Sequence, residues 1–177
     1  MTPSELGLMR HGSRRLLRFG RAREGATAIE FALVAVPFFM VIGWILEIGV
    51  MLFTEYALQN GVQDASRSIR TGAAAAMTGP QFLQQVCDNG SVVNDCAARL
   101  GIAVESAGTF AGITVPAIDT IGPGVQSFNS GGPEAAVTVI ATYDWEFIFP
   151  FMQPLSNVAG GKARRLHGMA VFRSEPF

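Results

Sequence analysis

A glycine and a glutamate five residues apart, Gly25 and Glu30, are the positions at which this sequence most clearly suggests chemistry. They stand where a basic segment meets an apolar one, in the stretch "REGATAIEFALVAVPFF" (residues 23–39). An ionised carboxylate is costly in lipid unless it has a partner. If the peptide bond after Gly25 were cut, Ala26 would carry a free α-amino group and Glu30 would become the fifth residue. The partner of the Glu30 carboxylate and the purpose of Gly25 are the questions that this stretch raises.

The two cysteines of the chain, Cys87 and Cys96, are a second candidate site. If the basic N-terminal segment faces the cytoplasm, both lie on the far side of the membrane, which is oxidising in a Gram-negative periplasm. A disulfide that closes this short loop would stabilise the fold by roughly 2–4 kcal/mol. Two buried thiols or a metal pair are the alternatives, but two cysteines without nearby histidines make a poor metal site. We favour the disulfide.

Signals of catalysis are weak elsewhere in the sequence. It has no Gly-x-Ser-x-Gly motif, no phosphate-binding glycine-rich loop and no paired metal ligands. Asp144 and Glu146 would share the polar face of one strand and could form a carboxylate pair, but a solvated face is favoured. His167 stands alone on a predicted strand. We therefore expect the chain to be the substrate of an enzyme and not an enzyme, with no cofactor and no metal site.

Charge is distributed unevenly along the chain. Residues 1–25 contain six arginines and two glutamates, a net charge of +4, whereas the remainder carries −5. A basic segment before an apolar run sets membrane orientation by the positive-inside rule. The arginines could instead form a nucleic-acid-binding arm. That alternative is disfavoured, because the apolar run follows immediately and no aromatic or Lys-rich patch accompanies them.

The apolar run extends from Phe31 to Phe53 and contains one charged residue, Glu47. As a helix these 23 residues would measure about 34 Å, enough to cross the hydrocarbon core with some tilt. Pro37 lies inside the run, and membrane helices tolerate proline with a kink. A buried core helix is the alternative, which the length and the basic flank disfavour.

The small residues near the apolar run, Gly25, Ala26 and Ala28, lie before it. A secretory signal peptide has its small-residue cleavage site after the apolar region. Cleavage after Gly25 would instead remove the basic leader and leave the apolar helix at the new N-terminus.

Four stretches together resemble the TadE-like proteins, the pseudopilins of tight-adherence (Flp-type) pilus systems. They are "GATAIEFALVAVPFF" with Gly25, Glu30, Phe31, Ala32, Leu33 and Pro37; "ILEIG" with Glu47 and Gly49; "ALQNGVQDASRSIRTG" (57–72); and "FRSEPF" (172–177). Gly61 departs from the alanine expected in the third stretch. A glycine there lowers helix propensity by about 1 kcal/mol and suggests a bend.

The resemblance implies a minor pilin-like subunit that a membrane prepilin peptidase cleaves between Gly25 and Ala26. It would take part in pilus initiation or tip assembly. Its implied partners are the peptidase, other pilin or pseudopilin subunits, the inner-membrane pilus platform and the lipid membrane, with no role for nucleic acid. The implied location is the bacterial inner membrane, in a single pass with a cytoplasmic N-terminus and a periplasmic C-terminal domain, and the subunit could enter the pilus. A mature chain of 152 residues is longer than a major subunit, which is little more than the helix. The alternative is an uncleaved, signal-anchored periplasmic binding or sensor module.

We expect Glu30 and Glu47 to have different surroundings. Glu30 would pair with the α-amino group of a neighbouring subunit and set the register between helices, or simply lie in the headgroup region. Glu47 is 17 residues further on, roughly 26 Å along the helix axis. It would lie near the opposite interface, where its carboxylate reaches water or pairs with a partner subunit.

The sequence divides into a basic leader (1–25), a transmembrane helix (26–53), an amphipathic extension (54–72) and a periplasmic domain (73–177). The extension places apolar residues on one face, which favours core packing. These residues are Leu58, Val62, Ala65 and Ile69. Gly72 is suited to the position after the helix end.

The periplasmic domain should combine short helices with an antiparallel sheet of three or four strands laid on the long helix, an α+β fold. Helices are predicted over 80–87 and over 95–100, the second capped by Asn94. Strands are predicted over 102–105, 110–115, 136–147 and 164–173. Residues 122–124 and 130–133 should be loops. The apolar stretch 147–155 should pack against the sheet or against a partner.

Overall fold

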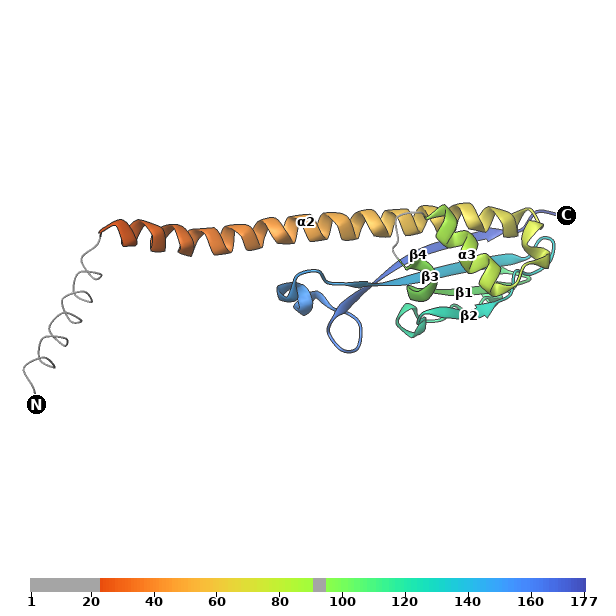
Figure 1. Ribbon diagram of the computed structural model, residues 1–177. Helices are drawn as coiled ribbons and strands as arrows, with labels where there is room; N and C mark the ends of the chain where they lie inside the picture. The colour runs from red at the N-terminus through yellow and green to blue at the C-terminus, as the bar shows by residue number, and fades with distance from the viewer. Residues whose placement is uncertain (1–22, 91–94) are drawn as a thin grey trace, which may run out of the picture. The chain divides into compact units, whose positions relative to one another are not determined.

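The computed structural model describes residues 23–90 and 95–177. Its longest element is helix α2, Arg23–Arg70, which continues without interruption through Pro37 (Figure 1). The chain divides into two compact units, Met1–Ile45 and Leu46–Phe177. Helix α2 contributes residues to both, so each unit is described by itself below.

In the first unit, the described residues are helical and their apolar side chains are exposed on all sides. The consecutive residues Phe31 to Val34 are all exposed, and 73% of the Phe31 surface is accessible. Because each residue is rotated by about 100° from the one before it, these four residues point to all sides of the helix. A helix that is apolar on all sides is normally buried, either in lipid or against other protein. Helix α2 is long and apolar enough to span a membrane. This agrees with the predicted single membrane pass.

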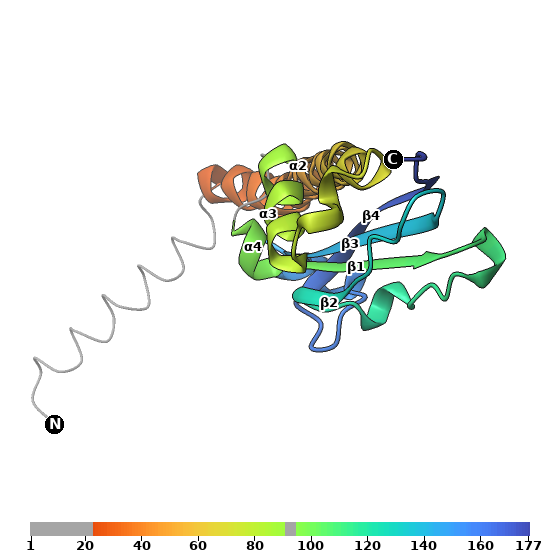
Figure 2. The ribbon, with the colours of Figure 1, turned by 90° about the vertical axis from the view of Figure 1, so that its right-hand side faces the viewer.

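In its described residues, the second unit contains the C-terminal part of α2, two short α-helices, four strands and four short 3₁₀ segments. The helices are α3 (Gly79–Asn89) and α4 (Cys96–Arg99), and the strands are β1 (Leu100–Ala107), β2 (Gly124–Phe128), β3 (Ala136–Glu146) and β4 (Ala163–Arg173). The 3₁₀ turns are η1 (Ala73–Ala76), η2 (Phe110–Gly112), η3 (Ile118–Thr120) and η4 (Pro150–Leu155). Helices α2 and α3 lie on the same face of the sheet (Figure 2).

The four strands form one sheet in the order β2-β1-β3-β4. Strand β3 is central and pairs antiparallel with β1 and with β4, for example Val139 opposite Val104 on one side and Ala170 on the other. Strand β2 pairs parallel with β1. The predicted α+β class is confirmed, but the sheet is mixed and not wholly antiparallel.

The main core lies between this sheet and the helices. The predicted stripe Leu58, Val62, Ala65 and Ile69 of α2 is fully buried there, together with Phe82 and Val86 of α3. The sheet contributes alternate residues of its three longer strands: Leu100, Ile102, Val104, Val137, Val139, Ala141, Tyr143, Leu166, Ala170 and Phe172. The period of two in the strands and the helical period in α2 meet at this interface, as the sequence predicted.

The opposite face of the sheet is partly covered as well. Ile121, from the segment that follows η3, packs with Ala103 and Ile140 in a small second cluster. The Thr142 hydroxyl donates a hydrogen bond of 2.9 Å to the Ile121 carbonyl. Thr138 and Thr142 are buried on this face, whereas Asp144 is half-buried and Glu146 is exposed at the end of the strand.

Three of the four predicted strands are confirmed, and the errors concern two short segments. Strands 136–147 and 164–173 correspond to β3 and β4, and 102–105 lies within β1. The predicted strand 110–115 is wrong, because Phe110–Gly112 forms a 3₁₀ turn. Strand β2 was not predicted, since it starts at Gly124, the last residue of a Gly-Pro-Gly sequence that was assigned to a loop.

The helix predictions are closer. Helix α3 covers the predicted range 80–87 and begins with a capping box in which Thr78 and Gln81 bond each other's backbone groups. Helix α4 lies within 95–100, and its predicted cap Asn94 lies outside the described residues. At the end of α2, Gly72 has a φ of +79° and its amide donates to the Ile69 carbonyl, as predicted for the residue after the helix end.

Gly61 has a packing role that its helix propensity did not indicate. A Cβ atom at this position would lie 2.8 Å from the Val86 carbonyl oxygen and 3.0 Å from the Gly90 Cα. Both atoms belong to backbone, so neither can move without shifting α3. The missing side chain lets α3 approach α2 closely.

We predict that Gly61→Ala destabilises the second unit by about 1–3 kcal/mol, because overpacking against backbone exceeds the gain in helix propensity. Gly49→Ala is the matched control, since nothing lies within 4 Å of a Cβ at that helical glycine. Denaturant unfolding of the full chain in detergent micelles measures both variants. Equal stability of the two variants would contradict this account of Gly61.

Candidate functional site

The segment that contains Gly25, Ala26 and Glu30 lies in the first unit, on the N-terminal turns of α2. Gly25 is exposed, and nothing described lies within 4 Å of a Cβ placed there. Its backbone is helical, a conformation that any residue adopts. Neither space nor backbone conformation therefore requires glycine at position 25.

Glu30 is exposed in the isolated chain, one helical turn after Ala26. Among the residues that the structure describes, none makes a hydrogen bond or an ion pair with its carboxylate. A carboxylate near the start of a helix interacts favourably with the helix dipole. A chain that began at Ala26 would place Glu30 close to such a start and to a new positive charge.

Glu47 is in the second unit and has an environment that the sequence did not predict. Only 2% of its surface is exposed. Its Oε1 accepts a hydrogen bond of 2.6 Å from the Ile148 amide, and its Oε2 accepts one of 3.2 Å from the Phe149 amide. The expectation that this carboxylate reaches water is wrong, because both oxygens bond to a loop of the same chain. Pairing with a partner subunit stays a prediction.

The loop that Glu47 binds connects β3 to β4 and contains the apolar stretch 147–155. Phe147 and Lys162 close its base by a hydrogen bond of 3.1 Å from amide to carbonyl. Met152 is buried, and the rings of Phe149 and Phe151 stack with centroids 5.2 Å apart. The stretch is therefore held to the α2 helix through Glu47, an attachment that the sequence did not predict.

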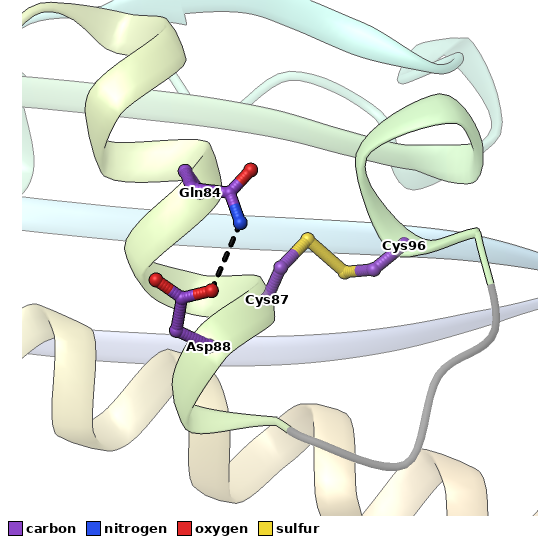
Figure 3. The surroundings of a disulfide bond; sticks show 4 residues. All are labelled: Gln84, Cys87, Asp88 and Cys96. Carbon is purple, nitrogen blue, oxygen red and sulfur yellow. Dashed lines mark hydrogen bonds between the residues drawn. A yellow bond between two sulfur atoms is a disulfide. The ribbon is translucent and has the colours of Figure 1, made fainter.

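Cys87 of α3 and Cys96 of α4 form a disulfide with an S–S distance of 2.01 Å, so the predicted pairing is confirmed. Figure 3 shows the bond joining the two helices beside the hydrogen bond from Gln84 to Asp88 on α3. Because α4 is a single turn followed directly by β1, this crosslink ties the start of the sheet to α3.

The acidic pair considered in the sequence is not formed. The Asp144 carboxylate receives two hydrogen bonds from the Arg165 guanidinium, of 2.6 and 2.8 Å, and the hydrogen bond to Asp144 raises the pKa of Arg165. Glu146 instead makes an ion pair of 3.4 Å with Arg99. Each carboxylate of β3 has its own arginine, Arg165 on β4 for Asp144 and Arg99 on α4 for Glu146, an arrangement that supports structure.

His167 lies beside an open groove of about 480 Å³ on the second unit. Its Nδ1 is 3.8 Å from a carboxylate oxygen of Glu55 on α2. The other lining residues are Leu52, Tyr56, Gln59 and Met169. In the described parts of the chain, no three histidine, cysteine or acidic residues come together as metal ligands would.

Sequence reasoning missed Gln59 as well as the use of Glu47. The Gln59 amide both donates to the Met169 carbonyl and accepts from the Met169 N–H, each at 2.9 Å. Met169 is on β4, an edge strand whose outward backbone groups would otherwise be open to another strand. Gly168 makes this possible, because a Cβ there would lie 3.1 Å from the Gln59 Cα. No local pattern marks such a contact between residues 110 positions apart.

These features define a class: within the described residues, the chain has one candidate membrane-spanning helix, and the C-terminal part of that helix packs on a small, disulfide-bonded α+β domain. The family model of the TadE-like proteins matches residues 25–67. The predicted resemblance is thereby confirmed, and this TadE-like segment contains Gly25, Glu30 and Glu47. The family match associates the chain with assembly of the tight-adherence pilus. Searches of the curated proteins and of the solved structures each found no match.

We predict that Glu47→Gln loosens the β3–β4 loop, because the two N–H donors bond to different carboxylate oxygens and one of these oxygens becomes an NH₂ donor in glutamine. Leaving a buried amide unsatisfied costs about 1–3 kcal/mol. Hydrogen exchange at the Ile148 and Phe149 amides should become faster, while exchange in β3 stays unchanged. Glu55→Gln is the control, since the Glu55 carboxylate is only partly buried. Unchanged exchange in Glu47→Gln would show that the carboxylate does not hold the loop.

Proposed function

We propose that this protein is a minor pilin-like subunit, a pseudopilin, of a tight-adherence pilus machine. A prepilin peptidase would cleave it between Gly25 and Ala26, after which it takes part in pilus initiation or tip assembly. The observation that carries the proposal is the TadE-like match, which begins at Gly25 and covers the exposed apolar helix. Its partners would be the peptidase, other pilin subunits and the inner-membrane platform.

The environment of Gly25 supports a role in recognition. Neither space nor backbone conformation requires glycine there. Its place at the start of the family match is therefore explained if another protein recognises this residue. A peptidase that accepts only a residue without a side chain before the scissile bond would recognise it in this way. The arginines before Gly25 then serve to orient the chain, with the N-terminus in the cytoplasm.

The contrast between the two helix carboxylates supports the proposed role of Glu30. Glu47 is buried and satisfied by its own chain, whereas Glu30 is exposed within an apolar surface. In lipid an ionised carboxylate needs a partner. The α-amino group of Ala26 on a neighbouring subunit would supply the opposite charge and would fix the register of two helices.

The second unit supports placement outside the cytoplasm. A disulfide persists in an oxidising compartment, and this one lies after the membrane helix in the chain. With the basic leader inside, the domain would be periplasmic. The proposal assigns the chain no catalytic role: it is processed by an enzyme and acts by assembling.

We predict that Gly25→Ala blocks removal of the leader without disturbing the fold, because no described atom lies within 4 Å of a Cβ at this position. Gly49→Ala is again the matched control, as a second helical glycine with open space around it. Immunoblots of cells that express the peptidase should show the longer form for Gly25→Ala and the shorter form for the control. If both variants are processed alike, Gly25 is not the recognition residue, and an uncleaved signal anchor is favoured.

We also predict that Glu30→Ala abolishes pilus assembly while membrane insertion and leader removal continue. The variant lacks the counter-charge for the new amine but keeps the apolar helix that inserts. Counting pili by electron microscopy and fractionating membranes measure the two properties separately. Normal piliation by Glu30→Ala cells would contradict the proposed register role.

A further inference from the structure

The β3–β4 loop carries an apolar surface that the assembly role of the helix does not use. Residues 147–161 contain no charged side chain. Within them, 64% of the Ile148 surface and 46% of the Leu155 surface are exposed. The loop extends beyond the end of the sheet at which β4 begins (Figure 1). An exposed apolar projection of this kind calls for an occupant.

The attachment of the loop places it at a defined level along α2. Glu47, which binds its backbone, is six residues before Phe53, the last residue of the predicted membrane span. Six residues of helix correspond to about 9 Å along the axis. If the span ends at Phe53, the loop is held at the depth of the outer part of the bilayer. The helix residues on either side of Glu47, Leu46 and Ile48, are themselves exposed and apolar.

The backbone of the loop is suited to such a depth. An unpaired N–H is costly in lipid, so irregular backbone is tolerated there only where its donors are satisfied. From residue 147 to 150 each donor is paired or absent. Phe147 donates to Lys162, Ile148 and Phe149 donate to Glu47, and Pro150 has no N–H. Met152 donates to the Phe149 carbonyl, and residue 154 is again proline.

Charge is arranged at the base of the loop as a lipid interface requires. Lys162 is exposed, and Arg164 donates to the Leu155 carbonyl at 3.2 Å while remaining partly accessible. The acidic residue at the other end of the base, Glu146, is paired with Arg99. Basic side chains beside an apolar projection are attracted to anionic headgroups.

We propose that the β3–β4 loop is a second membrane contact, which inserts its apolar residues into the outer leaflet beside α2 while Lys162 and Arg164 face the headgroups. Glu47 then has a function: it satisfies the loop's backbone where water cannot. The inference rests on the membrane helix of the proposed function. It implies that the domain is held against the bilayer at two points until the subunit leaves the membrane.

The test places single nitroxide labels on the full chain in vesicles of phosphatidylcholine with some phosphatidylglycerol. Ile148→Cys and Leu155→Cys report on the loop, and both sites are exposed enough to accept the label. Thr109→Cys is the matched control in an exposed turn of the same unit, and Val36→Cys reports on the helix. The native cysteines are joined in a disulfide and do not react.

Accessibility to oxygen, which partitions into lipid, is compared with accessibility to a water-soluble nickel complex. The proposal expects oxygen to dominate at 148, 155 and 36, and the nickel complex to dominate at 109. Lipid exposure at 36 with water exposure at 148 and 155 overturns the loop contact alone. Water exposure at all four sites overturns both the contact and the membrane helix. Water exposure of the loop in vesicles, with crosslinking of 155 to a protein in cells, overturns the lipid assignment in favour of a protein partner.

Discussion

The structure depends on one constraint: a single helix, α2, must be compatible with two different surroundings. Its first part is apolar on every side and makes no core with the described residues around it. Its C-terminal part buries one stripe against the sheet and leaves polar residues such as Gln63 and Asp64 exposed. Because the stripe fixes which side of α2 faces β3 and β4, it also fixes which helix residues can reach the loops of the domain. The contacts of Glu47 and Gln59 follow from that choice.

Carboxylates are the exceptions in the apolar half of such a helix, and the two present are treated differently. Glu47 is buried, and both of its carboxylate oxygens accept hydrogen bonds from backbone amides, so its polar atoms are satisfied. Glu30 has no such arrangement among the described residues, although it lies in an equally apolar sequence. The difference is explained if Glu47 serves the folded domain and Glu30 serves assembly. On this account one carboxylate finds its partner on folding, and the other finds it only after proteolysis.

Local patterns predicted much of the fold. The period of the α2 stripe, the alternation in β3 and β4, the glycine after α2 and the short loop between the cysteines all depend on neighbouring residues. The features that were missed depend on distant ones. Strand β2 is short and pairs parallel with β1, and its first residue belongs to a turn-like Gly-Pro-Gly sequence. The burial of Thr142 depends on Ile121, which a different part of the chain brings over the sheet.

In the candidate site too, the features that depend on neighbouring residues could be predicted from the sequence, and those that depend on distant residues could not. Gly25 and Glu30 are close in sequence, so their spacing was visible, and the family match covers the segment that contains them. The partners of Glu47 are 101 and 102 residues away, and backbone amides leave no signature in the side-chain sequence. An apolar stretch after β3 was apparent, but its attachment to α2 required the fold.

The central claim is that the functional N-terminus is made by cleavage after Gly25. The most direct measurement is N-terminal sequencing, with intact mass, of the protein purified from membranes of cells that contain the prepilin peptidase. The account predicts Ala26 as the first residue and a mass lower by that of residues 1–25. An intact leader on the protein from those cells would contradict it.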